Sequence, residues 1–438
     1  MTAPETDWSA FDRIRHERRR EQVASFVEFL RRDSVSQEPE RVRLCADWLA
    51  RRMEALGLRP QVLETGGNPA VFGERRVPGA TRTLLLYCHY DTKPIPRGGW
   101  LQPSPVEPVF RAGLAEAGAA IVPFEALPTD ALATHRVYAR GASDDKGPIW
   151  CHLEALACMD AAGLASRVNL KLIFDGEEEI GSPFFGPFTE SHRELLAADL
   201  VIVTDGPKHA SGRPTISGGA RGNMKLELEV EAARRDVHSG NFVVPNAAWR
   251  LNGLLSSMAT PDGTPLIGGL EEDVQLPSAA ERALMADIPV DFAALEKDLG
   301  VKAPADLLDR LMFHPTLTIR GLHSGFLGKE ANTIIPHRAT VLLDVRLVKN
   351  QTVARVYERI VAHIRAQGFT VLESPDEPLP DAVRGHAVRI VSKGAYDPAK
   401  TPLDLPVCRE LIAAVGRAHG GGRRLLLPPL GGSGALFG

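Results

Sequence analysis

Two adjacent carboxylates directly follow a short apolar run in the segment FDGEEEIGS, residues 174–182. The run NLKLIF, residues 169–174, is typical of a buried strand, and Gly181 permits a turn after Glu178 and Glu179. Carboxylates just past the end of a buried strand lie at the mouth of an α/β sheet, where ligands bind. Two neighbours can divide the work, one as a metal ligand and one as a general base for a water. Taken alone, the same residues also fit a solvated acidic turn.

Strands and helices alternate over the first two hundred residues. Apolar runs predict strands at 60–64, 69–73, 81–91, 169–174 and 199–205, and helical spacing predicts helices at 8–32, 40–56, 147–163 and 190–198. This alternation predicts an α/β fold with a mostly parallel, doubly wound sheet. The Pro- and Gly-rich segment 95–130 is expected to be irregular.

The pattern changes after about residue 212. Apolar and polar residues alternate with period two at 222–233 and 338–348, which predicts half-exposed antiparallel strands, and helical spacing recurs at 246–258, 278–296 and 352–367. We therefore expect an α+β domain, residues 215–395, inserted into the α/β domain. The helix predicted at 403–418 and the strand at 423–427 would return to that domain, whose two parts are 1–214 and 396–438.

Composition narrows the range of partners and compartments. The net charge is −4 and the pI is near 6.4, so nothing predicts a nucleic-acid or membrane partner. The five cysteines form no CxxC pair, which is typical of a reduced protein. The N-terminal residues contain no apolar signal region, and no stretch reaches the roughly 18 apolar residues of a membrane span. The expected compartment is the cytoplasm.

Acidic and imidazole side chains recur at the ends of the predicted strands. The sets are His89 with Asp91, Asp144 with Asp145, Glu178 with Glu179, and Asp205. Because the carboxyl ends of parallel strands open on one edge of a sheet, these side chains are expected to converge. One histidine with several carboxylates is the ligand chemistry that zinc or manganese requires, and a carboxylate between two ions permits a two-metal hydrolytic site.

Each set also has a plainer interpretation. His89 and Asp91 fit a buried histidine hydrogen-bonded to a carboxylate. Asp144 fits a helix N-cap, and Asp205 fits a turn residue. The recurrence of one chemistry at four places favours a metal site over four separate coincidences.

The ordered motifs HYDTKP, ARGASDDKGP, GEEEIGS, DVHSG and NTIIP resemble those of the di-metal aminopeptidase and carboxypeptidase superfamily. The narrower resemblance is to the carnosinase and cytosolic nonspecific dipeptidase branch, beside glutamate carboxypeptidase and the acetylornithine and succinyl-diaminopimelate deacylases. It runs from about residue 20 to the end of the chain. It implies a zinc-exopeptidase-like fold whose inserted domain acts as a lid and dimerises.

The resemblance also implies roles for the residues of the first domain. Two divalent ions, zinc or else manganese or cobalt, would be bound: His89 and Asp205 would hold one, Glu179 would hold the other, and Asp144 would bridge both. The peptide between Asp144 and Asp145 is often cis in the family. Asp91 would orient His89. Glu178 would be the general base that activates a metal-bridging water.

Further residues are implied in the inserted domain and near the C-terminus. His238 would reach the partner's site in a homodimer and stabilise the oxyanion, with Asn246 nearby. Arg346 would clamp a free C-terminal carboxylate, together with Asn332 and Thr333. Ser433 would contact substrate. Taken singly, His238 fits a surface histidine, Arg346 a strand salt bridge and Ser433 a Gly-rich turn.

The implied function is metal-dependent hydrolysis of dipeptides or short peptides, as by a dipeptidase or carboxypeptidase. The family pattern adds a histidine some tens of residues after the GGS loop, whereas this chain stops at Gly438. We therefore expect the C-terminal end of the α/β domain to be missing and one metal position to lack a ligand. The alternatives are an N-acyl-amino-acid amidohydrolase, an inactive relative that acts as a scaffold or binder, and a serine hydrolase using Ser433.

Overall fold

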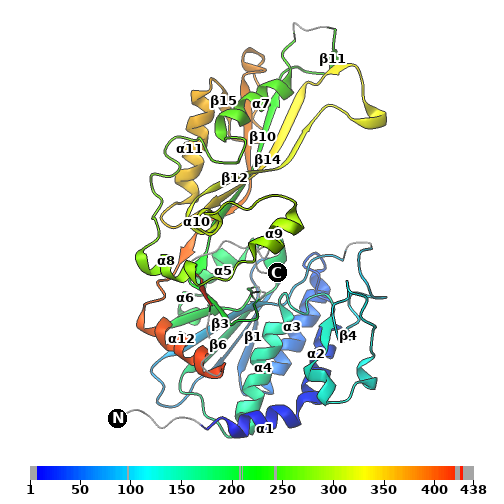
Figure 1. The fold of residues 1–438 in the computed structure, drawn as a ribbon, viewed down its shortest axis with the longest axis vertical. Helices are drawn as coiled ribbons and strands as arrows, with labels where there is room; N and C mark the ends of the chain where they lie inside the picture. The colour runs from blue at the N-terminus through cyan, green and yellow to red at the C-terminus, as the bar shows by residue number, and fades with distance from the viewer. Residues whose placement is uncertain are drawn as a thin grey trace. The chain divides into compact units, whose positions relative to one another are not determined.

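The structure is a computed structural model that describes residues 7–95, 98–206, 209, 211–240, 244–419 and 425–427. The chain divides into two units, Met1–Gly206 and Pro207–Gly438 (Figure 1).

The first unit is an α/β unit built on one five-stranded sheet. Its helices are α1 (Ser9–Glu17), α2 (Arg19–Leu30), α3 (Pro39–Glu54), α4 (Lys146–Ala161), α5 (Phe185–Ser191) and α6 (Arg193–Leu196). Its strands are β1 (Arg59–Leu63), β2 (Ala70–Arg75), β3 (Thr83–His89), β4 (Val109–Arg111), β5 (Arg136–Tyr138), β6 (Asn169–Asp175) and β7 (Leu200–Val203). The sheet has the order β1-β2-β6-β3-β7, and β4 and β5 form a separate pair.

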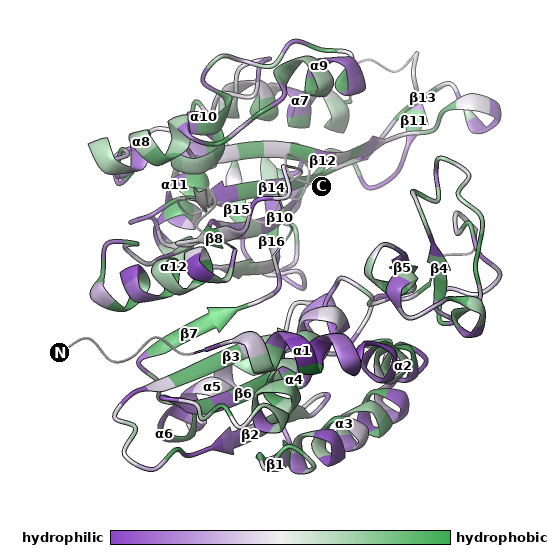
Figure 2. Cartoon of the chain, turned by 60° about the horizontal axis from the view of Figure 1, so that its bottom comes forward, coloured by the Kyte–Doolittle hydropathy of each residue, from purple (hydrophilic) through white to green (hydrophobic). Residues whose placement is uncertain are grey.

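Helices cover both faces of this sheet, which Figure 2 shows with β3 and β7 in hydrophobic colours. On one face, Leu49 of α3 and Leu153 of α4 pack with Phe174 in a buried cluster. On the other face, Phe188 of α5 packs with Ile173. Neighbouring residues of β6 therefore bury their side chains on opposite faces, as the period of a strand requires.

The expectation of a mostly parallel sheet is wrong at one edge. Strand β3 pairs in parallel with β6 and β7, but β1 with β2 and β2 with β6 are antiparallel. The connection 64–69 between β1 and β2 is too short for the crossover of a dozen or more residues that a parallel pair needs. The connection 76–82 from β2 to β3 is equally short, so β2 runs opposite to β3 and therefore opposite to β6, which is parallel to β3. The sheet is therefore mixed, with its parallel strands at the β6–β3–β7 side.

The second unit is α+β and is built on another five-stranded sheet. Its helices are α7 (Ala247–Met258), α8 (Ala279–Ala286), α9 (Phe292–Leu299), α10 (Leu307–Phe313), α11 (Val353–Ala366) and α12 (Pro406–Ala418). Its strands are β8 (Thr215–Ser217), β9 (Gly219–Ala220), β10 (Gly222–Glu231), β11 (Val237–His238), β12 (Thr316–Ser324), β13 (Ile334–Ile335), β14 (Arg338–Leu347), β15 (Thr370–Leu372), β16 (Ala387–Tyr396), β17 (Ala399–Lys400) and β18 (Leu425–Leu427). The sheet order is β12-β14-β10-β16-β15.

One face of the second sheet carries the core of this unit. Alternate residues of β10 and β14, such as Leu228 and Val341, pack with Leu251 of α7 and Ile360 of α11. The two strands predicted from period-two alternation are β10 and β14, and they pair antiparallel over ten residues. The intervening positions of β14, which include Arg346, lie on the opposite face.

Two local expectations in this unit need correction. The single helix expected at 278–296 is two helices, α8 and α9, because Pro289 lies between them and cannot continue a helix. Strands β12 and β16 were not expected from the sequence. Half of β12 is exposed and Gly394 interrupts β16, so neither shows clear alternation.

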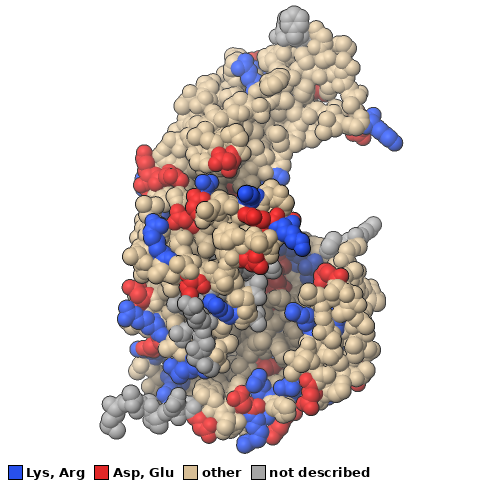
Figure 3. Space-filling model, viewed as in Figure 1, with Lys and Arg blue, Asp and Glu red and all other residues tan. Residues whose placement is uncertain are grey.

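The segment that follows β17 pairs within the second unit. Strand β18 pairs in parallel with β8. The three-part organisation, with residues 396–438 completing the α/β domain, stays a prediction, as do the lid and the missing C-terminal end. On the visible face of the first unit, basic and acidic side chains are interspersed, as the balanced composition predicts (Figure 3).

Candidate metal centre

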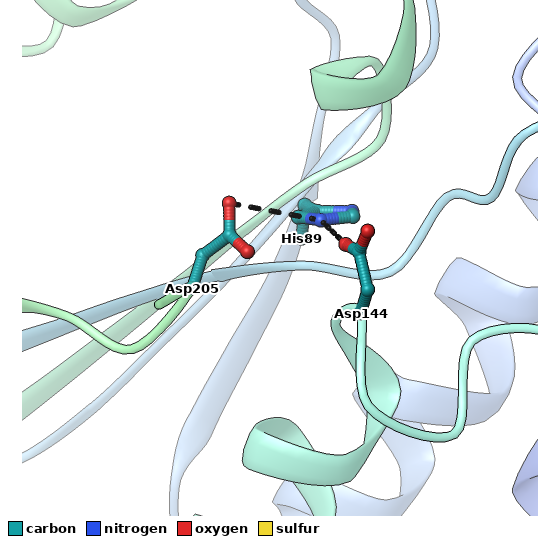
Figure 4. Close-up of side chains that lie close together, drawn as sticks. All are labelled: His89, Asp144 and Asp205. Carbon is teal, nitrogen blue, oxygen red and sulfur yellow. Dashed lines mark hydrogen bonds and ion pairs between the residues drawn. The ribbon is translucent and has the colours of Figure 1, made fainter. Parts of the chain in front are cut away.

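The predicted site residues of the first unit meet where its parallel strands end. His89 is the last residue of β3 and lies opposite Asp175, the last residue of β6, while Asp205 follows β7 by two residues. Asp144 lies just before α4. Figure 4 shows Asp144 and Asp205 on either side of the His89 ring, each directed toward it.

His89 is the centre of the group and is fully buried. Its Nε2 lies 2.8 Å from Asp144 Oδ1, 3.8 Å from Glu178 Oε2 and 3.9 Å from Asp205 Oδ2. Burial opposes a charge on the ring, but the hydrogen bonds to Asp144 and Asp91 outweigh it and raise the pKa of His89 to about 11. The ring is thus surrounded by acidic oxygens.

Asp91 holds the other side of that ring and also fixes the acidic turn. Its Oδ1 lies 3.2 Å from His89 Nδ1, and both side chains are buried. The backbone N–H groups of Glu178 and Glu179 donate to its two oxygens at 3.1 Å, and Ser36 donates its hydroxyl at 2.6 Å. One buried carboxylate therefore positions both the imidazole and the short 3₁₀ turn Glu178–Ile180.

Burial and mutual repulsion favour protonated carboxyls around His89. Burial raises the pKa of Glu178 to about 7, and nearby Asp205 and Glu179 add to the rise. Burial likewise raises the pKa of Asp205. Asp144 differs, because its hydrogen bond with His89 lowers the pKa of its carboxyl. A divalent cation would relieve this crowding of negative charge.

The donor set fits a divalent metal ion. Among the described residues, one ligand atom from each of His89, Asp144 and Asp205 lies within 4.8 Å of the other two. One imidazole with carboxylates is a combination that zinc, manganese and cobalt accept. Asp144 is not the helix N-cap that its position also suggested, because Asp145 occupies that place and makes no side-chain cap bond.

Glu179 lies apart from this group. Its carboxylate is 4% exposed, and Oε2 lies 2.6 Å from Nζ of Lys93. The role of Glu179 as a metal ligand, like the roles of the other site residues, stays a prediction. No role was assigned to Lys93 from the sequence, although it stands in the motif HYDTKP, two residues after Asp91.

Asp145 stood in one of the predicted acidic sets, but no individual role was assigned to it. The Asp144–Asp145 peptide is cis. Asp145 is fully buried, its Oδ2 accepts the backbone N–H of His89 at 3.1 Å, and burial raises its pKa to about 8. The only sequence signal for it was the doubled aspartate. The hydrogen bond between Asp145 and His89 joins the loop before α4 to the end of β3.

The second unit brings together three of its predicted site residues. Strand β11 pairs with β13 so that His238 faces Ile334, and Ser239 donates its backbone N–H to the carbonyl of Thr333 at 3.0 Å. His238, Asn332 and Thr333 are all exposed. Asn246 lies at the start of α7, where its Oδ1 accepts the N–H groups of Ala248 and Trp249. Its side-chain oxygen is therefore occupied as a helix cap.

Arg346 lies at the opposite end of β14 from the separate β11–β13 pair that carries His238. It stands on β14 opposite Asn223 and Thr316, and its Nε donates to Asp344 Oδ1 at 2.8 Å. Eight residues of extended strand separate Arg338, next to the β13 end, from Arg346, a span of about 26 Å. Ser433 lies outside the described residues.

Comparison with known proteins agrees with this chemistry. The profile of peptidase family M20/M25/M40 matches residues 85–435. Human Beta-Ala-His dipeptidase is 26% identical over 338 residues, and the match spans 73% of this chain but only 62% of the human protein. The cysteinylglycine-S-conjugate dipeptidase of Corynebacterium striatum is 27% identical, with 80% of this chain and 74% of that protein covered.

A solved structure extends the likeness to the fold. An M20 family metallo-carboxypeptidase from Sulfolobus solfataricus superposes with a TM-score of 0.75 at 30% identity, covering 94% of this chain and 86% of that one. No helix among the described residues is long and apolar enough to span a membrane. The profile match and this likeness show that the chain belongs to peptidase family M20/M25/M40, a family of metallopeptidases that use divalent metal ions.

Proposed function

We propose that the protein is a metal-dependent dipeptidase that hydrolyses dipeptides or short peptides with a free C-terminal carboxylate. The observation that carries this is the placement of His89 between Asp144 and Asp205, with Glu178 3.8 Å from the imidazole. The dipeptidases among the relatives support the choice of substrate. We further propose that it is a cytoplasmic homodimer.

The metal ions would be held by His89, Asp144, Asp205 and Glu179. When bound, such ions polarise a scissile carbonyl and lower the pKa of an attacking water. Asp91 would hold the imidazole from behind, through the contact at Nδ1. Zinc, manganese and cobalt all suit these ligands, with zinc the first choice.

Glu178 would move the proton during hydrolysis. Its Oε2 lies 3.8 Å from His89 Nε2, and among the described residues its carboxylate forms no ion pair with a lysine or an arginine. Its pKa of about 7 suits a group that takes a proton from the attacking water and returns it to the leaving amine near neutral pH. A general acid–base group of this kind contributes about 10²- to 10⁴-fold to the rate.

The separation within the second unit supports a site shared by two subunits. About 26 Å separates the β13 end of the sheet, beside His238, from Arg346, and a dipeptide is much shorter than that. We propose that Arg346 holds the substrate carboxylate in its own subunit. His238 of one subunit would stabilise the oxyanion in the other.

The second unit also offers a surface suited to such a dimer. A groove of about 430 Å³ lies between α7 and the strands β12 and β14. Trp249 and Leu322 line it and are 75% and 57% exposed. Exposed apolar side chains that cluster on one surface mark interaction sites. The isologous contact of a second copy would cover them.

The test is hydrolysis of a dipeptide panel by protein stripped with chelator and then reloaded. Dipeptides should be cleaved only after Zn²⁺, Mn²⁺ or Co²⁺ is restored, and their C-terminal amides should react about 10-fold more slowly or worse. Full hydrolysis in excess chelator would contradict the proposal. Preferential cleavage of N-acetyl amino acids would establish the deacylase alternative, and metal binding without turnover on either class would establish an inactive relative.

A further inference from the structure

Lys93 is a cation that reaches into the acidic group from just beyond β3. Its Nζ lies 2.6 Å from Glu179 Oε2. The lysine side chain is 61% exposed, whereas that of Glu179 is 4% exposed. A flexible, solvated arm thus delivers a positive charge to a buried carboxylate.

Glu179 needs a cation in this position. A buried carboxylate without a partner is costly, so it either takes up a proton or keeps an opposite charge beside it. The Glu179 backbone N–H is bonded to Asp91, which keeps the start of this side chain inside the acidic group. The ammonium of Lys93 supplies the charge that a metal ion would otherwise supply.

In the described part of the chain, no lysine ammonium pairs with the other predicted acidic ligands, Asp144 and Asp205. Among the described residues, neither Asp144 nor Asp205 forms an ion pair with a lysine or an arginine, and both face His89. A first metal ion would therefore meet ligands that are free of a competing ammonium. An ion held by Glu179 would compete with Lys93, because the ammonium already contacts Oε2 of that carboxylate.

We propose that Lys93 is a tethered counter-cation that occupies the metal position at Glu179 and makes metal loading stepwise. The first ion binds at His89, Asp144 and Asp205, and the second binds more weakly because it must displace the ammonium. This inference rests on the proposed metal-dependent function and concerns how the same centre is filled. Lys93 acts here as a positioning residue that sets metal occupancy.

The experiment is calorimetric titration of chelator-stripped protein with Zn²⁺ and with Mn²⁺, in the absence of peptide. The wild-type protein should bind two ions in separate steps. Lys93→Met should tighten the second step about 10- to 100-fold and leave the first within about twofold, because it removes a partly exposed competitor of the second ion. Lys93→Arg keeps the charge and should retain the weak second step.

Lys171→Met is the matched control, since it removes one lysine charge from the same unit but at β6, where the ammonium donates to the carbonyl of Ala197. It should leave both steps unchanged. A second step of equal strength in wild type and Lys93→Met would overturn the inference while leaving the metallopeptidase proposal intact. Failure of the wild-type protein to bind any ion would contradict both.

Thermal unfolding gives a second readout that needs no binding isotherm. Without metal, Lys93→Met leaves Glu179 buried and unpaired, so its melting temperature should fall below that of wild type. Saturating metal should restore it, so the metal-induced rise should be larger in the variant. If the metal-free variant is too unstable to titrate, Lys93→Gln provides the same comparison with a side chain that can hydrogen-bond. Equal metal-induced rises in wild type and both variants would overturn the inference.

Discussion

The two units hold the histidines of their predicted sites in opposite environments. In the first unit, His89 and Asp91 are fully buried, and backbone and side-chain donors hold the Asp91 carboxylate. In the second unit, His238, Asn332 and Thr333 are exposed at a two-stranded pair beside the main sheet. The first unit therefore sets a buried imidazole beside the exposed carboxylates of Asp144 and Asp205, while the histidine of the second unit is exposed to solvent.

On this contrast we propose different tasks for the two units. Charges fixed in a poorly solvated place act strongly on a reacting group, because neither they nor the surrounding water must reorganise. Exposed side chains cannot act in that way until another surface covers them. We therefore propose that the reaction chemistry belongs to the first unit, and that substrate capture and the contribution to a partner belong to the second.

The largest expected effect comes from Glu178→Gln. The amide cannot accept the proton, so kcat should fall about 10²- to 10⁴-fold, while metal content and melting temperature should stay near wild type. Steady-state kinetics and elemental analysis on the same sample check this. Unchanged turnover would show that Glu178 takes no part in the mechanism and would weaken the assignment of the reaction chemistry to the first unit.

The next effect tests whether the exposed residues serve a second subunit. His238→Ala should lower kcat about 10²- to 10³-fold by removing an oxyanion donor. Random mixing of His238→Ala and Arg346→Ala subunits should restore about one quarter of wild-type turnover, because half of the dimers are mixed and each holds one intact site. Co-expression with two affinity tags isolates the mixed dimer. If the isolated mixed dimer shows no more turnover than the His238→Ala or Arg346→Ala protein, the sites are not shared between subunits.

A smaller effect is expected from Arg346→Lys. A lysine keeps the charge but cannot form the two-pronged contact with a carboxylate, so kcat/KM for dipeptides should fall about 10- to 100-fold, chiefly through KM. Hydrolysis of C-terminal amides should fall far less. Equal losses on acids and amides would show that Arg346 serves the fold, through its bond to Asp344, instead of the substrate.

The smallest effect concerns the stability of the first unit. His152 of α4 lies 3.0 Å from Thr204 Oγ1, and burial lowers the pKa of His152 to about 4. The unfolded state then binds more protons below pH 6.5, so stability should fall as the pH drops from 6.5 toward 4. The loss by pH 5 should reach at most about 2 kcal/mol.

Denaturant unfolding of metal-free protein at pH 7.5 and 5.0 checks this last prediction. His152→Gln has no titrating group at this position, so its midpoint should depend less on pH than that of wild type. The second unit should show no change in its pH response. Identical pH dependence in the two proteins would mean that His152 titrates normally in the folded state.

Much of the first unit followed from its sequence. The strands expected at 81–91, 169–174 and 199–205 are β3, β6 and β7, and their parallel pairing brings His89, Asp144 and Asp205 together. Their long apolar runs and separating helices leave few alternatives. The antiparallel edge was missed because strand direction depends on the length of a connection and not on the apolar pattern of the strand.

The parts that could not be predicted depend on tertiary contacts. The contact of Lys93 could not be predicted from the sequence, because only the folded turn after β6 places Glu179 Oε2 2.6 Å from the lysine Nζ. The separation of His238 from Arg346 could not be predicted either. It follows from the register of β10, β13 and β14, which depends on side chains from distant parts of the chain. Neither relation leaves a local signal in the sequence.

The most direct test of the central claim is metal content measured by elemental analysis together with dipeptide hydrolysis on the same samples. Wild-type protein would be stripped in steps with chelator and compared with Asp205→Asn. The account predicts that turnover falls in proportion to bound metal and that Asp205→Asn retains less metal and less activity at every step. Full turnover from protein that retains no metal would contradict the claim that His89, Asp144 and Asp205 form a metal centre required for hydrolysis.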